Sequence, residues 1–492
     1  MKWILLSLLV GSTGYLSAQN EEDALRYSQE SLGGTARNMG MAGAMTALGG
    51  DYSSTLKNPA ATGRFSKSNF SFTTFVENNV TDANFLDNNL STSITNLKVG
   101  NISYLKAYNL NPNKFNGWAG VQLGVGYNRK QSFNQSFTYS GLSTGSLVDY
   151  FIAEAGNSSP TFIQENNAYS SGLAYDNYLI DPYFTSSDSI DYYYSSGAVG
   201  ASKHTRTVNT EGGMGEINFS LSGNYQNKLL IGGSLNIVTL NYNTNFIHNE
   251  VFTDSISWVN EFDYTGYIDA NGTGVNARVG MIYTPVEFLR LGASIETPTR
   301  LVITEKSDNT IVNETDSDRY NYDSQPPLIS EYIVRTPLKA NFSIGLVHKK
   351  FGSLGAELEI VDYSTAKMKS NFDNPLFFYS YIDENNQIRN LYRSTINLRF
   401  GAEARLNEQL YVRGGYALYG SAYKAEKGVY DQAISTFTGG IGYNFGEVYL
   451  DFAAVMRTVG SEHIAYLPEL EGSTSFIENN RKQFVLSLGY RF

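Results

Sequence analysis

The sequence contains no cysteine, and only 11 prolines and four histidines, in 492 residues. Without cysteine the chain has no disulfides, thiolate metal sites or cysteine nucleophiles. It also lacks a basic cluster, and its formal net charge of −11 argues against a nucleic-acid binder, which must neutralise phosphates. No apolar run is long enough to cross a membrane as a helix. If the chain spans a membrane, it does so as a β-barrel.

The N-terminus has the features of an export signal. Lys2 is followed by a short apolar run at 4–10, and Ser17-Ala18 precedes Gln19 like a cleavage site, although Leu16 is larger than usual at its position. We therefore expect residues 1–18 to be a signal peptide that is cleaved near Ala18 and is not part of the fold.

The chain is rich in residues that suit twisted strands, with 46 Gly, 36 Tyr and 28 Phe. In 482–492, Phe484, Leu486, Leu488, Tyr490 and Phe492 alternate with residues that are mostly small or polar. Side chains alternate between the two sides of a strand, so this pattern predicts a strand with one apolar face.

The same alternation recurs along the chain and predicts about 14 antiparallel strands. The expected spans are 66–76, 97–108, 116–129, 214–225, 228–243, 274–284, 288–298, 338–347, 353–363, 394–406, 409–419, 434–445, 447–457 and 482–492. The segment 256–268 also alternates, and we interpret it as an extension because an extra strand would make the number odd. Single-chain bacterial barrels have an even number of strands.

Three features favour a transmembrane barrel over a soluble sandwich. Polar faces carry charges of both signs in mid-strand, short and long connections alternate, and the chain ends on an aromatic residue, Phe492. The sequence therefore predicts an all-β transmembrane barrel over 66–492 with long extracellular loops, of which 130–213 is the longest. In that loop, SLVDYFIAEAG predicts a short helix, and we expect the loop to cap the outer mouth.

A barrel of this size is too wide for its own wall side chains to fill. The segment 19–65 suits a plug, because a short helix is expected at its start and the residues from Thr35 to Leu48 are mainly Ala, Met and Gly. A solvated leader would be more polar, so we favour an N-terminal hatch of short helices inside the lumen.

The stretch GGTARNMGMAGAMTALGGDYSSTLKNPAATG resembles the N-terminal signature of FadL-type outer-membrane transporters of long-chain fatty acids and other hydrophobic compounds. This resemblance implies a 14-stranded barrel with an N-terminal hatch, uptake by facilitated diffusion, and sideways exit beside a kinked third strand. It implies that Asn58, Pro59 and Ala60 form the hatch motif. Gly120, Gly124 and Gly126 in the third expected strand are compatible with the kink, since Gly in a strand marks bends or close approaches.

The alternatives are a general or specific porin, a hemin-binding receptor, and a structural barrel that binds partner proteins. The lumen-facing set Glu357, Glu359, Arg399, Glu403, Arg405, Arg413 and Asp451 would line an ion path in a porin, but we favour neutralising pairs. His204 and His248 are the residues that would contact haem iron, although no close pair of histidines is expected.

The sequence does not predict an enzyme. The segment GLSTG at 141–145 matches the G-x-S-x-G elbow, but a catalytic Ser143 would need a strand before it and a helix after it in an α/β sheet. We expect a flexible linker there, and neither a cofactor nor a bound metal. The expected location is the outer membrane of a Gram-negative bacterium. The expected partners are the lipid bilayer and lipopolysaccharide, a hydrophobic ligand, and the barrel-assembly machinery through Phe492, with the chain as a monomer.

Overall fold

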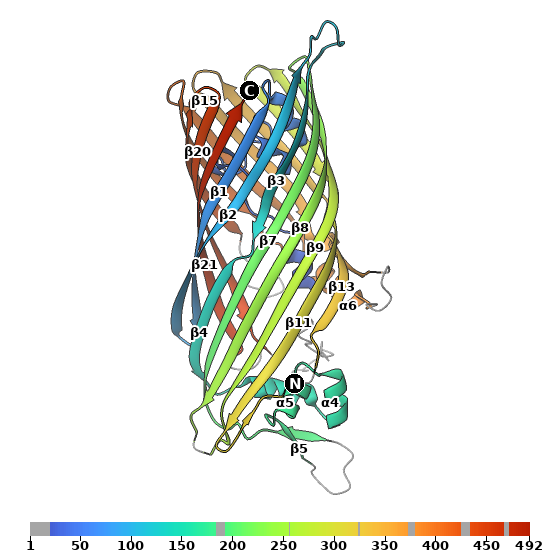
Figure 1. Cartoon of the computed structure of the whole chain (residues 1–492), viewed down its shortest axis with the longest axis vertical. Helices are drawn as coiled ribbons and strands as arrows, with labels where there is room; N and C mark the ends of the chain where they lie inside the picture. The colour runs from blue at the N-terminus through green and yellow to red at the C-terminus, as the bar shows by residue number, and fades with distance from the viewer. Residues whose placement is uncertain are drawn as a thin grey trace, which may run out of the picture.

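The computed structural model describes residues 20–183, 192–254, 256–322, 325–371, 379–424, 433–466 and 472–492. The expected signal peptide at 1–18 lies outside these residues. Within them the chain forms a closed antiparallel barrel of 14 strands, as predicted, and β1 (Asn69–Phe85) closes the wall by pairing with both β2 (Asn88–Asn109) and β21 (Thr474–Arg491) (Figure 1).

The other wall strands follow in chain order. They are β3 (Trp118–Ser132), β7 (Ser202–Tyr225), β8 (Leu229–Phe252), β9 (Val259–Val286), β10 (Leu289–Glu296), β14 (Lys339–His348), β15 (Gly352–Asp362), β17 (Ser394–Arg405), β18 (Leu410–Tyr419), β19 (Ile434–Asn444) and β20 (Val448–Ile464).

Several of these strands are interrupted and then continue along the wall. The continuing segments are β4 (Gln135–Ser143), β11 (Arg300–Thr315) with the short β12 (Arg319–Tyr320), β13 (Leu328–Arg335) and β16 (Lys367–Ser370). A separate two-stranded sheet is formed by β5 (Asp181–Tyr183) and β6 (Tyr193–Ser195).

The helices are short and occur in three groups. The N-terminal segment 20–65 contains α1 (Glu21–Arg26), α2 (Ala36–Gly40), and the 3-10 helices η1 (Tyr52–Leu56) and η2 (Pro59–Arg64). The insertion between β4 and β7 contains α3 (Leu147–Ala155), α4 (Pro160–Asn166) and α5 (Ser171–Asp176), and later loops contain η3 (Tyr363–Thr365) and α6 (Ile382–Leu391). No helix among the described residues is long and apolar enough to cross a membrane.

The wall is apolar outside and polar inside. On β21, Phe484, Leu486 and Leu488 are exposed, whereas Gln483 and Ser487, which face inward, are buried. The outward face becomes polar at Lys482, Asn480 and Glu478 toward the start of β21. The barrel therefore carries an apolar outer band that ends part-way along its strands, as expected for a wall that extends beyond a bilayer on one side.

The turns at the two ends of the barrel differ in length. At the end that holds the C-terminus, neighbouring strands are joined by tight turns such as Gln226–Asn227, where both residues have positive φ. At the opposite end, insertions and the long strand extensions gather, with α4, α5 and β5 at the bottom of Figure 1.

The number of strands and their order agree with the prediction, but the strands run further than expected at the end with the long insertions. Residues 77–96, which were not assigned to a strand, complete the β1–β2 hairpin around Leu86 and Asp87. The extension expected at 256–268 is present from Val259 onward, where it forms the first part of β9. Beyond the apolar band the outer face is polar, so the alternation that marks a strand in the sequence is lost there.

Candidate functional site: an N-terminal segment beside a break in the barrel wall

One section of the wall lacks strand pairing. β2 and β3 pair only from Asn101–Asn128 to Asn109–Gly120, although β2 continues to Asn88 along β1, and β3 and β4 continue along β7. No ladder joins 88–100 to 129–143 among the described residues, and we call this the wall break. It begins at two irregularities, a bulge at Gly100 in β2 and a register shift between Arg129 and Gln131 in β3.

The wall break begins within the apolar outer band. Leu97 and Val99 on β2 are exposed on the outer face, and Leu97 lies opposite Val76 of β1 in that band. On the same side, the guanidinium Nε of Arg129 donates to the carbonyl oxygen of Val99 at 3.2 Å, so one side chain of β3 bridges to β2 across the break.

The N-terminal segment covers the wall break from inside. The amide and hydroxyl of Ser31 donate to the carbonyl oxygen of Lys130 at 3.2 and 3.0 Å. Gly33 packs so closely that a Cβ there would lie 2.2 Å from the carbonyl oxygen of Arg129. A cavity of about 10 Å³, which is room for one water at most, remains between Ser31–Gly34, Gly100 and Gln131.

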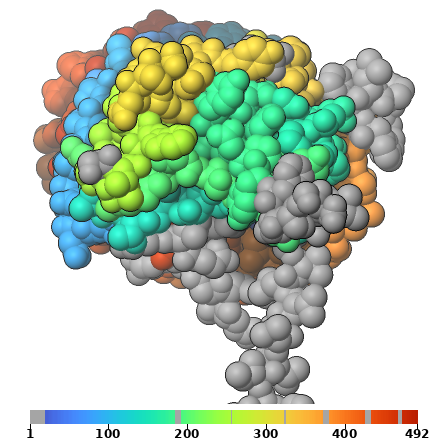
Figure 2. Space-filling view, turned by 90° about the horizontal axis from the view of Figure 1, so that it is seen from below, coloured from blue at the N-terminus to red at the C-terminus, as the bar shows by residue number. Residues whose placement is uncertain are grey.

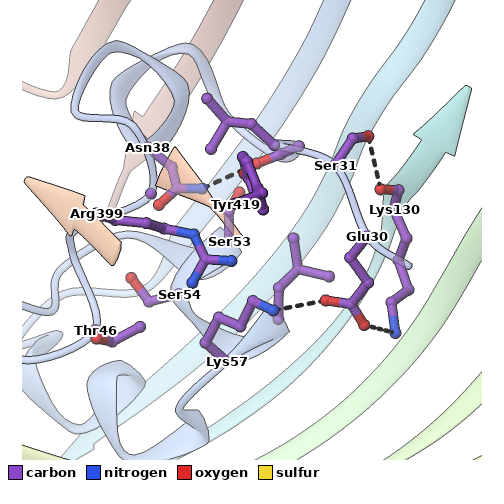
Figure 3. A pocket seen from close by; sticks show the side chains of 14 residues that line it. Glu30, Ser31, Asn38, Thr46, Ser53, Ser54, Lys57, Lys130, Arg399 and Tyr419 are labelled. Carbon is purple, nitrogen blue, oxygen red and sulfur yellow. Dashed lines mark hydrogen bonds and ion pairs between the residues drawn. The ribbon is translucent and has the colours of Figure 1, made fainter. Parts of the chain in front are cut away.

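An ion cluster fixes this segment to the wall (Figure 3). The carboxylate of Glu30 lies 2.6 Å from the ammonium of Lys57 and 2.7 Å from that of Lys130 on β3, as Figure 3 shows. It also lies 2.6 Å from the ammonium of Lys339 on β14. Lys57 also pairs with Glu359. Burial alone would raise the pKa of the Glu30 carboxyl, but Lys130, Lys339 and Lys57 together hold this pKa well below its usual value. Glu30 is therefore a buried anion shared by three cations.

Further ion pairs close the lumen around α2 and η1. Arg37 of α2 makes two hydrogen bonds of 2.9 and 2.8 Å with the carboxylate of Glu403, which also accepts from Arg413 at 2.7 Å. Arg278 pairs with Glu216 and Glu296 and donates to the carbonyl oxygen of Thr55 at 3.3 Å. The cavity beside Glu30 and Arg399 has a volume of only about 30 Å³, so the described residues leave little space at this point of the lumen.

An apolar layer lies beyond the ion cluster, and part of the N-terminal segment fills it. Ala24, Leu25 and Tyr27 are buried there with wall residues that include Phe133 and Tyr242. The rings of Phe133 and Tyr242 lie edge-on to Tyr27, each with its centroid 6.3 Å from that of Tyr27. Phe133 directly follows the end of β3, so this apolar interior adjoins the wall break.

Solved structures show which known barrels share this architecture. A FadL homologue of Pseudomonas aeruginosa superposes with a TM-score of 0.55 and 13% identity, over 94% of this chain and 99% of that chain. The toluene transporter TodX of Pseudomonas putida gives a TM-score of 0.53 and 14% identity, over 94% and 99%. This chain has the FadL-type barrel fold. No protein-family model and no curated protein matches the sequence.

In this FadL-type barrel, Asn58, Pro59 and Ala60 dock on the wall formed by β7, β8 and β9, away from the wall break. The Asn58 side chain accepts from the amide of Ala60 at 3.1 Å and donates to the carbonyl oxygen of Met281 at 3.2 Å. Ala60 and Ala61 pack on Leu230 and Ile282. The motif thus anchors the start of η2 to the wall, and its role in gating stays a prediction.

The three glycines predicted for a kink lie at different places in β3. A Cβ at Gly124 or Gly126 would lie 2.6 Å from the ring of Tyr52, so both make room for this side chain of η1. The β3–β7 register is continuous there, and it shifts between Trp118 and Gly120 and again between Arg129 and Gln131. Of these three glycines, only Gly120 lies next to a register shift. The register shift at the wall break, between Arg129 and Gln131, lies C-terminal to all three.

The lumen-facing charges form pairs, as favoured from the sequence, with one exception. Arg399 pairs with Glu357 and Glu359, and Arg413 with Glu403 and Asp451. The prediction for Arg405 is wrong, because its guanidinium lies at the exposed turn near Asn407 and donates to backbone carbonyls there.

The insertion at 130–213 is partly strand and partly helix. It contains the end of β3, β4, and the start of β7, and the predicted helix in SLVDYFIAEAG is α3, which begins with a capping box at Ser146 and Asp149. Figure 2 views this end of the barrel and shows the insertion packed beside the ends of β8, β9 and β11. The tyrosine-rich stretch at 191–196 lies only partly within the described residues.

Ser143 is not in a nucleophile elbow, nor is it in a flexible linker. It ends β4, which runs antiparallel to β7, and its hydroxyl forms a local turn with the amide and carbonyl of Gly145 at 3.1 and 3.0 Å. The α/β context that the motif requires is absent from this part of the chain.

The expectation that the histidines form no close pair is wrong. His204 and His248 lie on neighbouring strands with their ring centroids 5.4 Å apart, and both side chains are fully buried. Neither ring presents a surface to a macrocycle such as haem.

The sequence gives only weak signals for the residues that form the wall break. Gly100 is a lone glycine between Val99 and Asn101, which is compatible with a bulge, but many strands here contain glycine. The contact of Glu30 with Lys130 and Lys339 joins positions 100 and 309 residues apart, and no local pattern records it.

Proposed function

We propose that this protein is an outer-membrane channel that takes up hydrophobic small molecules by facilitated diffusion and releases them sideways through the wall break. The observation that carries the proposal is the position of the wall break, which lies between an apolar interior and the apolar outer band. The FadL homologue and the toluene transporter that share the fold support the same function.

The physical reason for a sideways exit is that a hydrophobic molecule then need not enter water. Moving apolar surface from water to an apolar site is worth about 25 cal/mol per Å². In this structure α1 and residues 31–34 fill the path, so the N-terminal segment acts as a hatch that must shift before a ligand passes. An open porin is less well supported, because ion pairs and the hatch fill the layer around Glu30.

The cargo class is either neutral aromatic hydrocarbons or long-chain fatty acids. Uptake of labelled toluene and of labelled oleate is measured in cells that lack other such transporters, with and without this protein. We expect faster uptake of at least one of the two compounds and little ion conductance of the purified protein in planar bilayers. A large steady conductance together with no gain in uptake of either compound would contradict the proposal.

We also propose how the protein reaches the outer membrane. We infer that residues 1–18 direct export and that Phe492, which pairs with Ser68 at the start of the wall, is presented to the assembly machinery of the outer membrane. We also propose that the barrel works as a monomer among lipid and lipopolysaccharide.

A further inference from the structure

Two histidines and one carboxylate meet in the part of the barrel that lies beyond the apolar band. His204 of β7 lies opposite Glu250 of β8, and His248 of β8 lies opposite Arg206 of β7. The Nε2 atom of His248 is 2.9 Å from one oxygen of Glu250, and the Nε2 atom of His204 is 3.5 Å from the other. All three side chains are fully buried.

The separations of these atoms suit a metal ion. One ligand atom from each of His204, His248 and Glu250 lies within 4.8 Å of the others. A tetrahedral zinc ion with bonds of about 2.0–2.1 Å needs donors roughly 3.3 Å apart, so only small side-chain shifts would close the set around an ion. The hydroxyl of Ser202 lies 2.9 Å from Nε2 of His204 and is a neighbouring oxygen donor.

We propose that His204, His248 and Glu250 form a binding site for a divalent transition metal of the zinc type. Two imidazoles with one carboxylate favour zinc, copper, nickel or cobalt over calcium or magnesium, which prefer oxygen ligands. Arg206, which is buried and lies opposite His248, is a nearby cation that opposes any divalent ion, so the affinity would come from the two imidazole ligands and not from net charge.

The site would link the wall to the insertion. Glu250 accepts hydrogen bonds from the hydroxyl of Ser146 at 2.6 Å, from the amide of Leu147 at 2.8 Å and from the hydroxyl of Ser202 at 3.1 Å. Ser146 and Leu147 begin α3. A metal on Glu250 would therefore hold β7, β8 and the start of α3 together and stabilise the insertion over the end of the barrel, whatever the channel transports.

The test uses the full-length protein in detergent after removal of metals with a chelator. Because the site is buried, the protein is equilibrated with Co²⁺ for hours before spectra are recorded. We expect the visible absorption of four-coordinate Co²⁺ at one equivalent, its loss on addition of Zn²⁺, and slower proteolysis of the insertion with Zn²⁺. His204→Ala and His248→Ala should each weaken Co²⁺ binding at least tenfold.

The matched control is His348→Ala, which removes an exposed histidine at the end of β14, beside the tight turn to β15. It should leave binding unchanged, and heat-modified gel mobility checks that each variant has formed the barrel. The proposal is overturned if the wild-type protein binds no Co²⁺, or if both histidine variants that form the barrel bind it as tightly as the wild type does. If either histidine variant does not assemble, Glu250→Gln is measured in its place, and unchanged Co²⁺ binding by the assembled Glu250→Gln protein overturns the proposal.

Discussion

Glu30 attaches the N-terminal segment to two wall strands at once, through Lys130 on β3 and Lys339 on β14. It is buried, and its single charge is shared by Lys57, Lys130 and Lys339. Two of these lysines have other acidic partners, which are Glu216 and Glu296 for Lys130 and Glu359 for Lys57. Among the described ion pairs, Lys339 has no acidic partner besides Glu30.

Glu30→Gln should loosen the hatch. Removal of one partner of a buried ion pair costs about 3–5 kcal/mol, because the remaining charge is left without compensation. We expect more frequent channel openings in planar bilayers and faster proteolysis at 20–35. The control is Glu287→Gln, since Glu287 pairs with Lys349 at an exposed turn and should affect neither measurement. Equal behaviour of the two variants would contradict this role of Glu30.

Glu30 also determines how the attachment of the hatch depends on pH. The folded-state pKa of Glu30 is held well below its usual value, so its contribution to stability is present above the unfolded pKa and is lost only as the pH falls toward the folded pKa. The hatch in the wild-type protein should therefore stay closed at pH 4, where an ordinary glutamate is largely protonated.

The side-chain amide of Asn58 links the hatch to the wall. Its oxygen accepts from Ala60 in the hatch, and its nitrogen donates to Met281 on β9 of the wall. Asn58→Ala removes the side-chain cap of η2 and the bond to Met281, for a loss of about 1 kcal/mol. We expect a several-fold faster release of the hatch, measured as channel-opening frequency. Asn111→Ala removes a similar side-chain-to-backbone bond in an exposed turn and serves as the control. Unchanged opening in Asn58→Ala would exclude the motif from gating.

At the scale of elements, α2 provides a means to lock the hatch. A Cβ at Gly40 would lie 3.6 Å from the Cβ of Ala453 on β20, within the range of about 3.5–4.5 Å for disulfides. The chain has no native cysteine, so the pair Gly40→Cys and Ala453→Cys introduces the only two thiols.

The oxidised double variant should show uptake near the background rate, and a reductant should restore it. Each single cysteine variant should transport normally under both conditions. If the oxidised double variant, with its cross-link confirmed, transports as fast as the wild type, then α2 does not move during transport.

At the scale of the whole molecule, the barrel could be predicted because each strand in the apolar band repeats the same alternation. That signal gave the strand number, the order and the tight turns. The segment 256–268 was expected as an extension, but the extension at 77–96 was missed because a wall with water on its outer face no longer needs apolar residues there. The family resemblance implied a sideways exit beside the third strand, but the residues of the wall break were not predicted, because they depend on a loss of pairing between 88–100 and 129–143 that single-strand patterns do not record. The histidine cluster was missed because cross-strand register brings His204 beside His248.

Sideways exit is tested most directly by filling the wall break. Gly100 lines it, and a Cβ there would lie 3.3 Å from Gly34, Phe75 and Thr73. Gly100→Trp is compared with Gly233→Trp, which adds the same side chain to β8 where both neighbouring strands are paired. With equal amounts of assembled barrel, we predict that Gly100→Trp lowers uptake of the transported compound at least tenfold and that Gly233→Trp changes it less than twofold. Wild-type uptake by Gly100→Trp would contradict sideways exit through the wall break.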